Sequence, residues 1–200
     1  MPFATCCTRT LNAHRDEKVG EVILGTDVRR LMKESFKTGL SFGLTSGIIT
    51  TLGLIVGLHS GTHSKFVVIG GIITIAIADA LSDALGIHVS QESQNRHSTR
   101  AIWESTIATF LTKLAVALTF VIPILLLPNT TAIVVSVGWG LFLLVLFNFY
   151  MAKGQKVRPW SVIAEHVLIA LVVIILSHSV GLWIDSALST TSSTPVPTLR

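Results

Sequence analysis

The sequence predicts an all-α membrane protein in which five transmembrane helices form one domain. Half of the residues are hydrophobic and only 13% are charged, and the mean hydropathy is +0.69. A soluble chain would need more charge to cover its surface, whereas a bilayer accepts an apolar exterior. Apolar stretches of about 20 residues recur along the chain, each long enough to span the hydrocarbon core. Because lipid cannot hydrogen-bond the backbone, each stretch should be a helix.

The polar segment that precedes the first apolar stretch has two parts. Residues 1–26 show little periodicity, and we expect them to be flexible. Thr26 and Asp27 provide a helix-start signal, and apolar residues then recur at helical spacing between basic ones. We therefore predict a short amphipathic helix over residues 27–37 on an anionic membrane surface, with packing on the transmembrane bundle as the alternative.

Basic residues predict how the spans are oriented. Twelve Lys and Arg residues lie in the N-terminal segment and in the polar connectors after the second and fourth stretches, whereas only Lys65 and Arg200 lie on the opposite side. By the positive-inside rule, we expect a cytoplasmic N-terminus and an outer or lumenal C-terminal tail, residues 187–200, that is disordered. The apolar stretches cover residues 38–60, 66–88, 106–127, 131–151 and 162–184.

Glycines recur at four-residue spacing along the first stretch. Small residues at this spacing line one face of a helix and let another helix approach closely. We expect helix packing at this face, and we predict a homodimer through the first helix. The two series are Gly39, Gly43 and Gly47, followed by Gly53, Gly57 and Gly61.

Two acids lie inside the second stretch. Asp79 follows about 20 Å of helix after Lys65, and Asp83 lies one turn closer to the cytoplasm on the same helix face. A charge inside a transmembrane segment costs at least about 2.5 kcal/mol, so something must offset two of them. The offset can be protonation of one carboxyl, a bridging cation, or an ion pair with Lys113 of the third stretch. For Lys113 itself, we expect snorkelling to the cytoplasmic interface, with a side chain that faces a polar cavity as the alternative.

Further polar residues extend this candidate site. Oxygen ligands suit Mn²⁺, Fe²⁺, Mg²⁺ or Ca²⁺ better than Cu⁺. The hydroxyls of Thr45 and Ser46 lie in the middle of the first stretch, where they can also bond their own helix carbonyls. Glu165 begins the fifth stretch beside His166, at a position where helix N-termini favour acids.

No set of residues indicates an enzyme. The sequence contains no nucleophile–base set, no nucleotide-binding loop and no zinc-ligand spacing, and Glu92 and Glu104 are too far apart in sequence to be strong evidence for a metal site. We attribute the net charge of +4 to the Lys and Arg residues that set the orientation of the spans in the membrane. We therefore do not expect nucleic-acid binding.

Two runs of residues resemble a known family. Residues 43–54, which read GLTSGIITTLGL, look like the first-helix signature of vacuolar iron transporter-like proteins. Residues 79–94 are similar to the second-helix run of that family. The resemblance covers roughly residues 36–186. It implies a five-helix dimer in the plasma membrane or a vacuole-like endomembrane that exports Fe²⁺ or Mn²⁺ from the cytosol by proton antiport.

The sequence departs from that family at three positions and in one connector. Ser46 replaces a family aspartate, Asp83 replaces a methionine, and Ile87 replaces a glutamate. The carboxylate-rich cytoplasmic insert between the second and third helices is replaced by a short link.

The resemblance also implies roles for the candidate residues. The metal would be the transported substrate, without a prosthetic group. The alternative is a non-transporting scaffold or assembly subunit that keeps the family fold, in which the aspartates pair with Lys113. In the transporter, Asp79 and Asp83 would be ligands and proton acceptors, Thr45 and Ser46 weak ligands, and Glu92, Glu104 and Glu165 cation-attracting groups at the cytoplasmic mouth.

Overall fold

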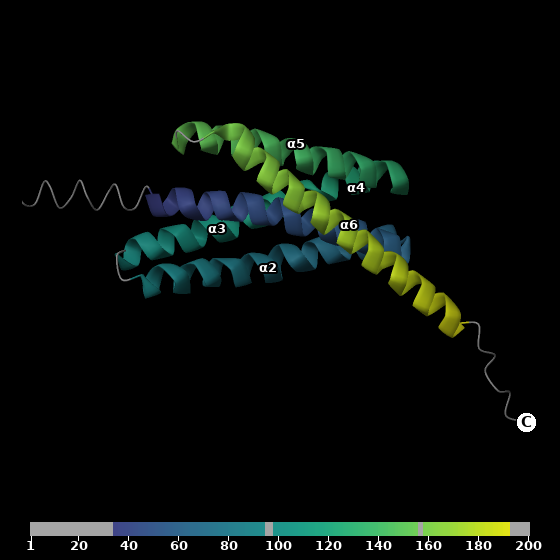
Figure 1. Cartoon of the computed structure of the whole chain (residues 1–200). Helices are drawn as coiled ribbons and strands as arrows, with labels where there is room; N and C mark the ends of the chain where they lie inside the picture. Colours follow the sequence, from purple (N-terminus) through teal and green to yellow (C-terminus); the bar gives the residue numbers. More distant parts are fainter. Residues whose placement is uncertain (1–33, 95–97, 156–157, 193–200) are drawn as a thin grey trace, which may run out of the picture.

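The chain forms a bundle of long helices (Figure 1). The computed structural model describes residues 34–94, 98–155 and 158–192. Within these residues there is no strand, and five helical spans are long and apolar enough to cross a membrane. The predicted fold class is confirmed, and the cytoplasmic location of the N-terminus stays a prediction. The elements are a first helix, Glu34–Thr62, then α2 (Lys65–Ser93), α3 (Thr99–Thr119), α4 (Val121–Leu126), α5 (Asn129–Gln155) and α6 (Pro159–Ser192).

The helices extend beyond the predicted apolar stretches. Backbone hydrogen bonding continues past the hydrocarbon core, so polar residues add turns at the helix ends. Residues 34–37 of the predicted amphipathic helix belong to the first helix, and α6 continues to Ser192, into the predicted tail. The rest of that amphipathic helix, the predicted flexible segment 1–26 and residues 193–200 lie outside the described residues.

The first helix lies at the centre of the bundle. Half of its most apolar 18-residue window is buried, compared with 11% of the corresponding window in α6. Its side chains Ile48, Leu52 and Ile55 are fully buried in a core shared with α2 to α6. The outer helices expose many large apolar side chains, and these form the surface that lipid covers in a membrane.

The first glycine series packs against α3. A Cβ atom at Gly39 would clash with the backbone carbonyl of Ser105, and one at Gly43 would lie 2.8 Å from the carbonyl oxygen of Thr109. Each step of four residues along the first helix therefore matches a step of four along α3. The two backbones approach so closely that only glycine fits at these positions.

The second glycine series packs against α6, which crosses the first helix obliquely (Figure 1). A Cβ atom at Gly57 would lie 3.3 Å from the carbonyl oxygen of Ser177, and one at Gly61 would lie 3.2 Å from that of Gly181. The predicted helix packing at the glycines thus occurs within one chain. A homodimer through the first helix stays a prediction.

A proline divides the third span. Pro123 cannot donate a backbone hydrogen bond to Thr119, four residues earlier, and the regular helix α3 ends at Thr119. The span continues as α4, whose final carbonyl groups need other partners. Lys65 supplies them, because its Nζ lies 3.0 Å from the carbonyl oxygens of both Leu125 and Leu127.

Candidate ion site inside the membrane

A line of polar side chains runs along the inner face of α3. Ser105, Thr109 and Lys113 recur every four residues, and each is at most 2% exposed. The Ser105 hydroxyl donates to Gln91 Oε1 of α2 at 2.6 Å, and Thr109 Oγ1 lies 3.2 Å from the carbonyl oxygen of Gly39. The glycines of the first helix provide room for this line, because a larger residue would push α3 away.

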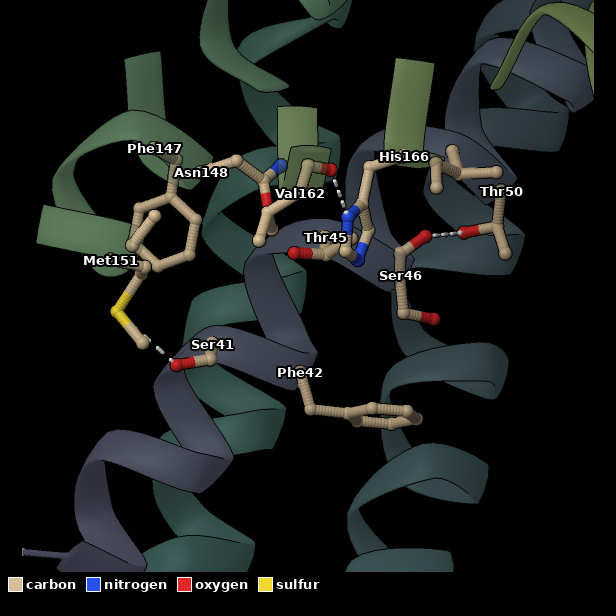
Figure 2. Close-up of a pocket in the computed structure, with 12 residues that line it drawn as sticks. Ser41, Phe42, Thr45, Ser46, Thr50, Phe147, Asn148, Met151, Val162 and His166 are labelled. Carbon is tan, nitrogen blue, oxygen red and sulfur yellow. Dashed lines mark hydrogen bonds between the residues drawn. The ribbon is translucent and has the colours of Figure 1, made fainter. Parts of the chain in front are cut away.

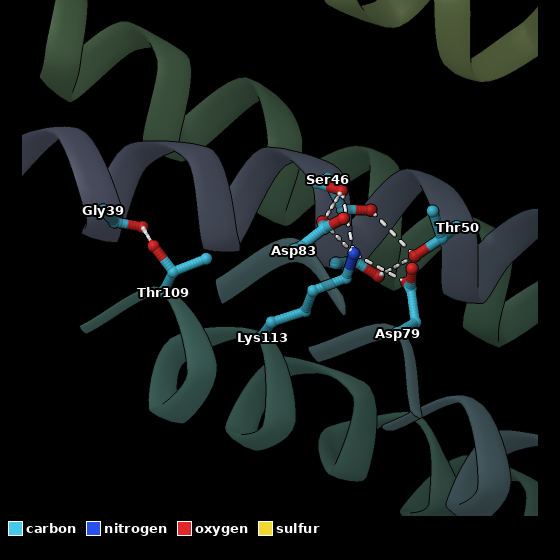
Figure 3. A network of polar contacts seen from close by, with 8 residues as sticks. Gly39, Ser46, Thr50, Asp79, Asp83, Thr109 and Lys113 are labelled. Atoms are coloured by element: carbon cyan, nitrogen blue, oxygen red, sulfur yellow. Dashed lines mark hydrogen bonds and ion pairs between the residues drawn. The ribbon is translucent and has the colours of Figure 1, made fainter. Parts of the chain in front are cut away.

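Lys113 is the last residue of this line, and its ammonium forms ion pairs with two acids of α2. Its stem passes over Gly47, where a Cβ atom would lie 3.1 Å from Lys113 Cγ. Its ammonium lies 2.6 Å from Asp79 Oδ2, forms an ion pair with Asp83 Oδ2 and donates to Ser46 Oγ at 3.0 Å (Figure 3). We call Ser46, Asp79, Asp83 and Lys113 the Lys113 cluster.

The prediction that Lys113 snorkels to the interface is wrong. Its side chain is 2% exposed and points into the bundle. Snorkelling lowers the energy of a charge that lacks a partner at membrane depth. Here, Asp79 and Asp83 lie one turn apart on the facing helix, so the ammonium finds two partners inside.

The Lys113 cluster has an excess of negative charge. When all three groups are ionised, two carboxylates and one ammonium leave a net charge of −1. Ser46 adds a hydrogen bond to Asp83 Oδ2 at 2.8 Å. The side chains of Asp79 and Asp83 remain 25% and 22% exposed. The cluster can therefore attract a cation, and its carboxylate oxygens are ligands that hard divalent cations prefer.

A second polar site lies across the first helix from this cluster. It is a cavity of about 540 Å³ between the first helix, α5 and α6, and we call it the His166 cavity (Figure 2). Ser46 lines this cavity and also belongs to the Lys113 cluster, so it separates the two sites. The other polar or sulfur-containing residues of the lining are Ser41, Thr45, Thr50, Asn148, Met151 and His166.

Hydrogen bonds orient two of the groups in this cavity. His166 Nδ1 lies 2.8 Å from the carbonyl oxygen of Val162. A carbonyl oxygen only accepts, so Nδ1 carries the proton and Nε2 of the neutral ring has a free lone pair. The amide nitrogen of Asn148 donates to the carbonyl of Leu144 at 2.8 Å, which leaves Oδ1 as an acceptor. Both side chains can thus offer a lone pair to a cation.

The structure divides the predicted site residues. Asp79, Asp83 and Ser46 lie together in the Lys113 cluster, whereas Thr45 lines the His166 cavity. The three glutamates belong to neither site. Glu104 pairs with Arg100 at 3.3 Å, and Glu92 and Glu165 are exposed at the ends of α2 and α6.

Sequence reasoning missed Asn148 and Met151. A signal existed for Asn148, because an amide within an apolar span needs a partner, and this side chain is only 4% exposed. Methionine is common in apolar helices, so Met151 gave no signal. Among the described residues, no three His, Cys, Asp or Glu side chains form a group that could hold a metal.

Comparison with known proteins shows that part of the chain is similar to a family. Residues 40–102 match the model of the VIT family. Comparisons with curated proteins and with solved structures gave no match. The matched segment contains Ser46, Asp79 and Asp83, whereas Lys113 and His166 lie beyond it. The family resemblance predicted from the first two helices is confirmed over this segment.

Proposed function

We propose that this chain, which is VIT-like over residues 40–102, transports divalent transition-metal cations, with Fe²⁺ or Mn²⁺ as the substrate. The family and the five apolar spans indicate a multi-pass membrane protein of a metal-ion transporter family. The observation that carries the finer proposal is the pair Asp79 and Asp83. Both lie within the matched segment and inside a span, where uncompensated charge is costly and usually functional.

The ion pair with Lys113 suggests how transport is coupled to protons. A divalent cation on two carboxylates forms a neutral group, but a protonated lysine beside it would add an unfavourable positive charge. Release of the Lys113 proton, together with displacement of its nitrogen from the carboxylates, would change the net charge of the site from −1 without metal to zero with metal. This exchange supports proton antiport, with export from the cytosol as the proposed direction. We further propose a homodimer in the plasma membrane or a vacuole-like endomembrane.

Metal flux into proteoliposomes tests this function. The full-length protein is reconstituted, and uptake of Fe²⁺, Mn²⁺, Mg²⁺ and Ca²⁺ is measured with and without a pH gradient. We expect uptake of Fe²⁺ or Mn²⁺ that the gradient accelerates. The variant Asp79→Asn/Asp83→Asn/Lys113→Met removes the three charges together and should reduce uptake to the liposome background.

Asp185→Asn is the matched control, because it removes a carboxylate from α6 outside both sites, and it should transport like wild type. Transport by the charge-free variant at the wild-type rate would refute the role of the aspartates. Absence of flux for every cation in the wild type would refute transport itself.

One observation favours the alternative function, a membrane scaffold or assembly subunit. The Lys113 ammonium already neutralises part of the carboxylate charge, as a purely structural ion pair would. In that case, the swapped variant Lys113→Asp/Asp83→Lys should regain the stability that either single change removes. Rescue of thermal stability, combined with no metal flux in the wild type, would support the scaffold.

A further inference from the structure

We propose that the His166 cavity binds a divalent transition-metal cation before the cation reaches the Lys113 cluster. This inference rests on the proposed function and adds a site whose histidine lies beyond the family match. The ligand groups come from the first helix, α5 and α6.

The imidazole of His166 is the principal ligand. Its Nδ1–H is held by the Val162 carbonyl at 2.8 Å, which fixes the ring and leaves Nε2 as the donor atom. A hydrogen bond from the other ring nitrogen is the usual support of a metal-binding histidine. Figure 2 shows the ring reaching from α6 toward Thr45 and Ser46 of the first helix.

Three further side chains bring different donor atoms to the same cavity. Asn148 offers Oδ1, Thr45 offers its hydroxyl oxygen, and Met151 carries a thioether sulfur that also accepts a hydrogen bond from Ser41 Oγ at 3.5 Å. Imidazole nitrogen with amide oxygen and sulfur suits Fe²⁺ or Co²⁺ better than Mg²⁺ or Ca²⁺, which prefer oxygen alone. The mixed set therefore selects a transition metal.

The charge that attracts the cation lies next to the cavity. The cavity lining contains no Asp, Glu, Lys or Arg, but the Lys113 cluster carries a net charge of −1 when its groups are ionised. Ser46 contacts Asp83 and Lys113 and also lines the cavity. In a low-dielectric interior, this negative charge acts across the short distance with little screening. The cluster therefore borders the cavity at Ser46.

A second cavity connects the site with the beginning of the first helix. It has a volume of about 830 Å³ and reaches Glu34 and Lys37, at the predicted cytoplasmic side. The two cavities adjoin, because they share lining residues of the first helix and α5. The two cavities therefore form one continuous groove between the first helix and α5, which leads from Glu34 and Lys37 toward His166. The shared residues are Ser41, Phe42, Phe147 and Met151.

Titration of the purified full-length protein with Co²⁺ in detergent tests the site. Visible absorption of bound Co²⁺ reports nitrogen ligation, and equilibrium dialysis gives the affinity. His166→Ala should weaken Co²⁺ binding at least about tenfold. His166→Gln keeps most of the side-chain volume but has no imidazole, so it should show the same loss if the first variant folds poorly. His178→Ala is the control, because His178 lies on the same helix and outside the cavity, where its Nδ1 contacts Ser60 Oγ at 2.6 Å.

The outcomes separate this inference from the proposed function. If wild type binds no Co²⁺, or if both His166 variants bind it like wild type, the cavity site is refuted, whatever the flux assay shows. Metal flux in wild type would then leave the transport function intact. If His166 is required for Co²⁺ binding but wild type transports no metal, the cavity is a binding site and transport is refuted.

Discussion

The two polar sites on either side of Ser46 differ in charge and in access. The Lys113 cluster contains two carboxylates and its own cation, and the ammonium is 2% exposed. The His166 cavity contains neutral donor atoms in a space of about 540 Å³ that adjoins a second cavity. One site thus has charge but already holds an internal cation, whereas the other has space and ligands but no charge of its own.

This difference suggests that the two sites have different roles in cation binding. Carboxylates inside a membrane need a partner in every state of the protein, and Lys113 supplies one when no metal is bound. An unpaired neutral group costs less at this depth than an unpaired charge, so a cavity lined by neutral groups can remain open at a smaller energetic cost. A neutral site beside a negatively charged cluster can therefore receive a cation that the cluster later accepts by exchange with a proton.

The largest expected effect comes from removing the internal cation. Lys113→Met leaves Asp79 and Asp83 facing each other without compensation, and we expect a loss of about 3 kcal/mol of stability. Thermal unfolding in detergent measures it as a lower midpoint. The charge-free variant Asp79→Asn/Asp83→Asn/Lys113→Met should recover most of this loss. A Lys113→Met protein as stable as wild type would show that the ion pair does not stabilise the fold.

A substitution on the face of the first helix that packs against α3 should disturb the Lys113 cluster and leave the His166 cavity intact. Gly39→Ala places a methyl group against the Ser105 carbonyl, so α3 must shift, at a cost of about 1–3 kcal/mol. Gly86→Ala is the control, because no atom lies within 4 Å of an added Cβ there, and alanine should be neutral or slightly stabilising. Thermal unfolding compares the two variants. We expect Co²⁺ binding at His166 to survive in Gly39→Ala, and its loss would show that the sites are not separate.

Loss of the residue between the sites should have a smaller effect. Ser46→Ala removes the hydroxyl that donates to Asp83 and accepts from Lys113, and we expect about 1 kcal/mol of destabilisation. Thr74→Ala should cost less, because that hydroxyl is exposed and bonds only its own helix, at Gly70. Equal unfolding midpoints for Ser46→Ala and wild type would contradict the role of Ser46 in the Lys113 cluster.

The smallest expected effect concerns metal selectivity in the His166 cavity. Met151→Leu keeps the volume but removes the sulfur, so Co²⁺ and Fe²⁺ should bind a few-fold more weakly, while Mn²⁺, which favours oxygen, should be little affected. Competition dialysis with pairs of metals measures the ratio. An unchanged ratio would remove Met151 from the ligand set while leaving the test of His166 unaffected.

Periodicity and position in the apolar spans made much of this molecule predictable. Apolar length predicted the five spans. The spacing of four placed Asp79 and Asp83 on one helix face, and both contact the same ammonium. These inferences needed only the geometry of a single helix.

The assignment of side chains to sites needed the tertiary structure. Thr45 and Ser46 are neighbours in sequence and both line the His166 cavity, yet only Ser46 also contacts Asp83 and Lys113, and only the packing of α2 and α3 on the first helix shows this. Lys113 was expected at the interface, with an ion pair to the aspartates as one alternative, and only the packing of α3 against α2 shows that the ion pair forms. Asn148, Met151 and His166 meet because α5 and α6 pack beside the first helix.

The sequence by itself determined the spans, the shared face of the two aspartates and the close-packing glycines, because each follows from the lengths and periods of one helix. Only the tertiary structure decided that Lys113 turns inward and that neutral ligands gather across Ser46. These features depend on how neighbouring helices are aligned along their axes, and close contacts such as Gly39 with Ser105 fix that alignment.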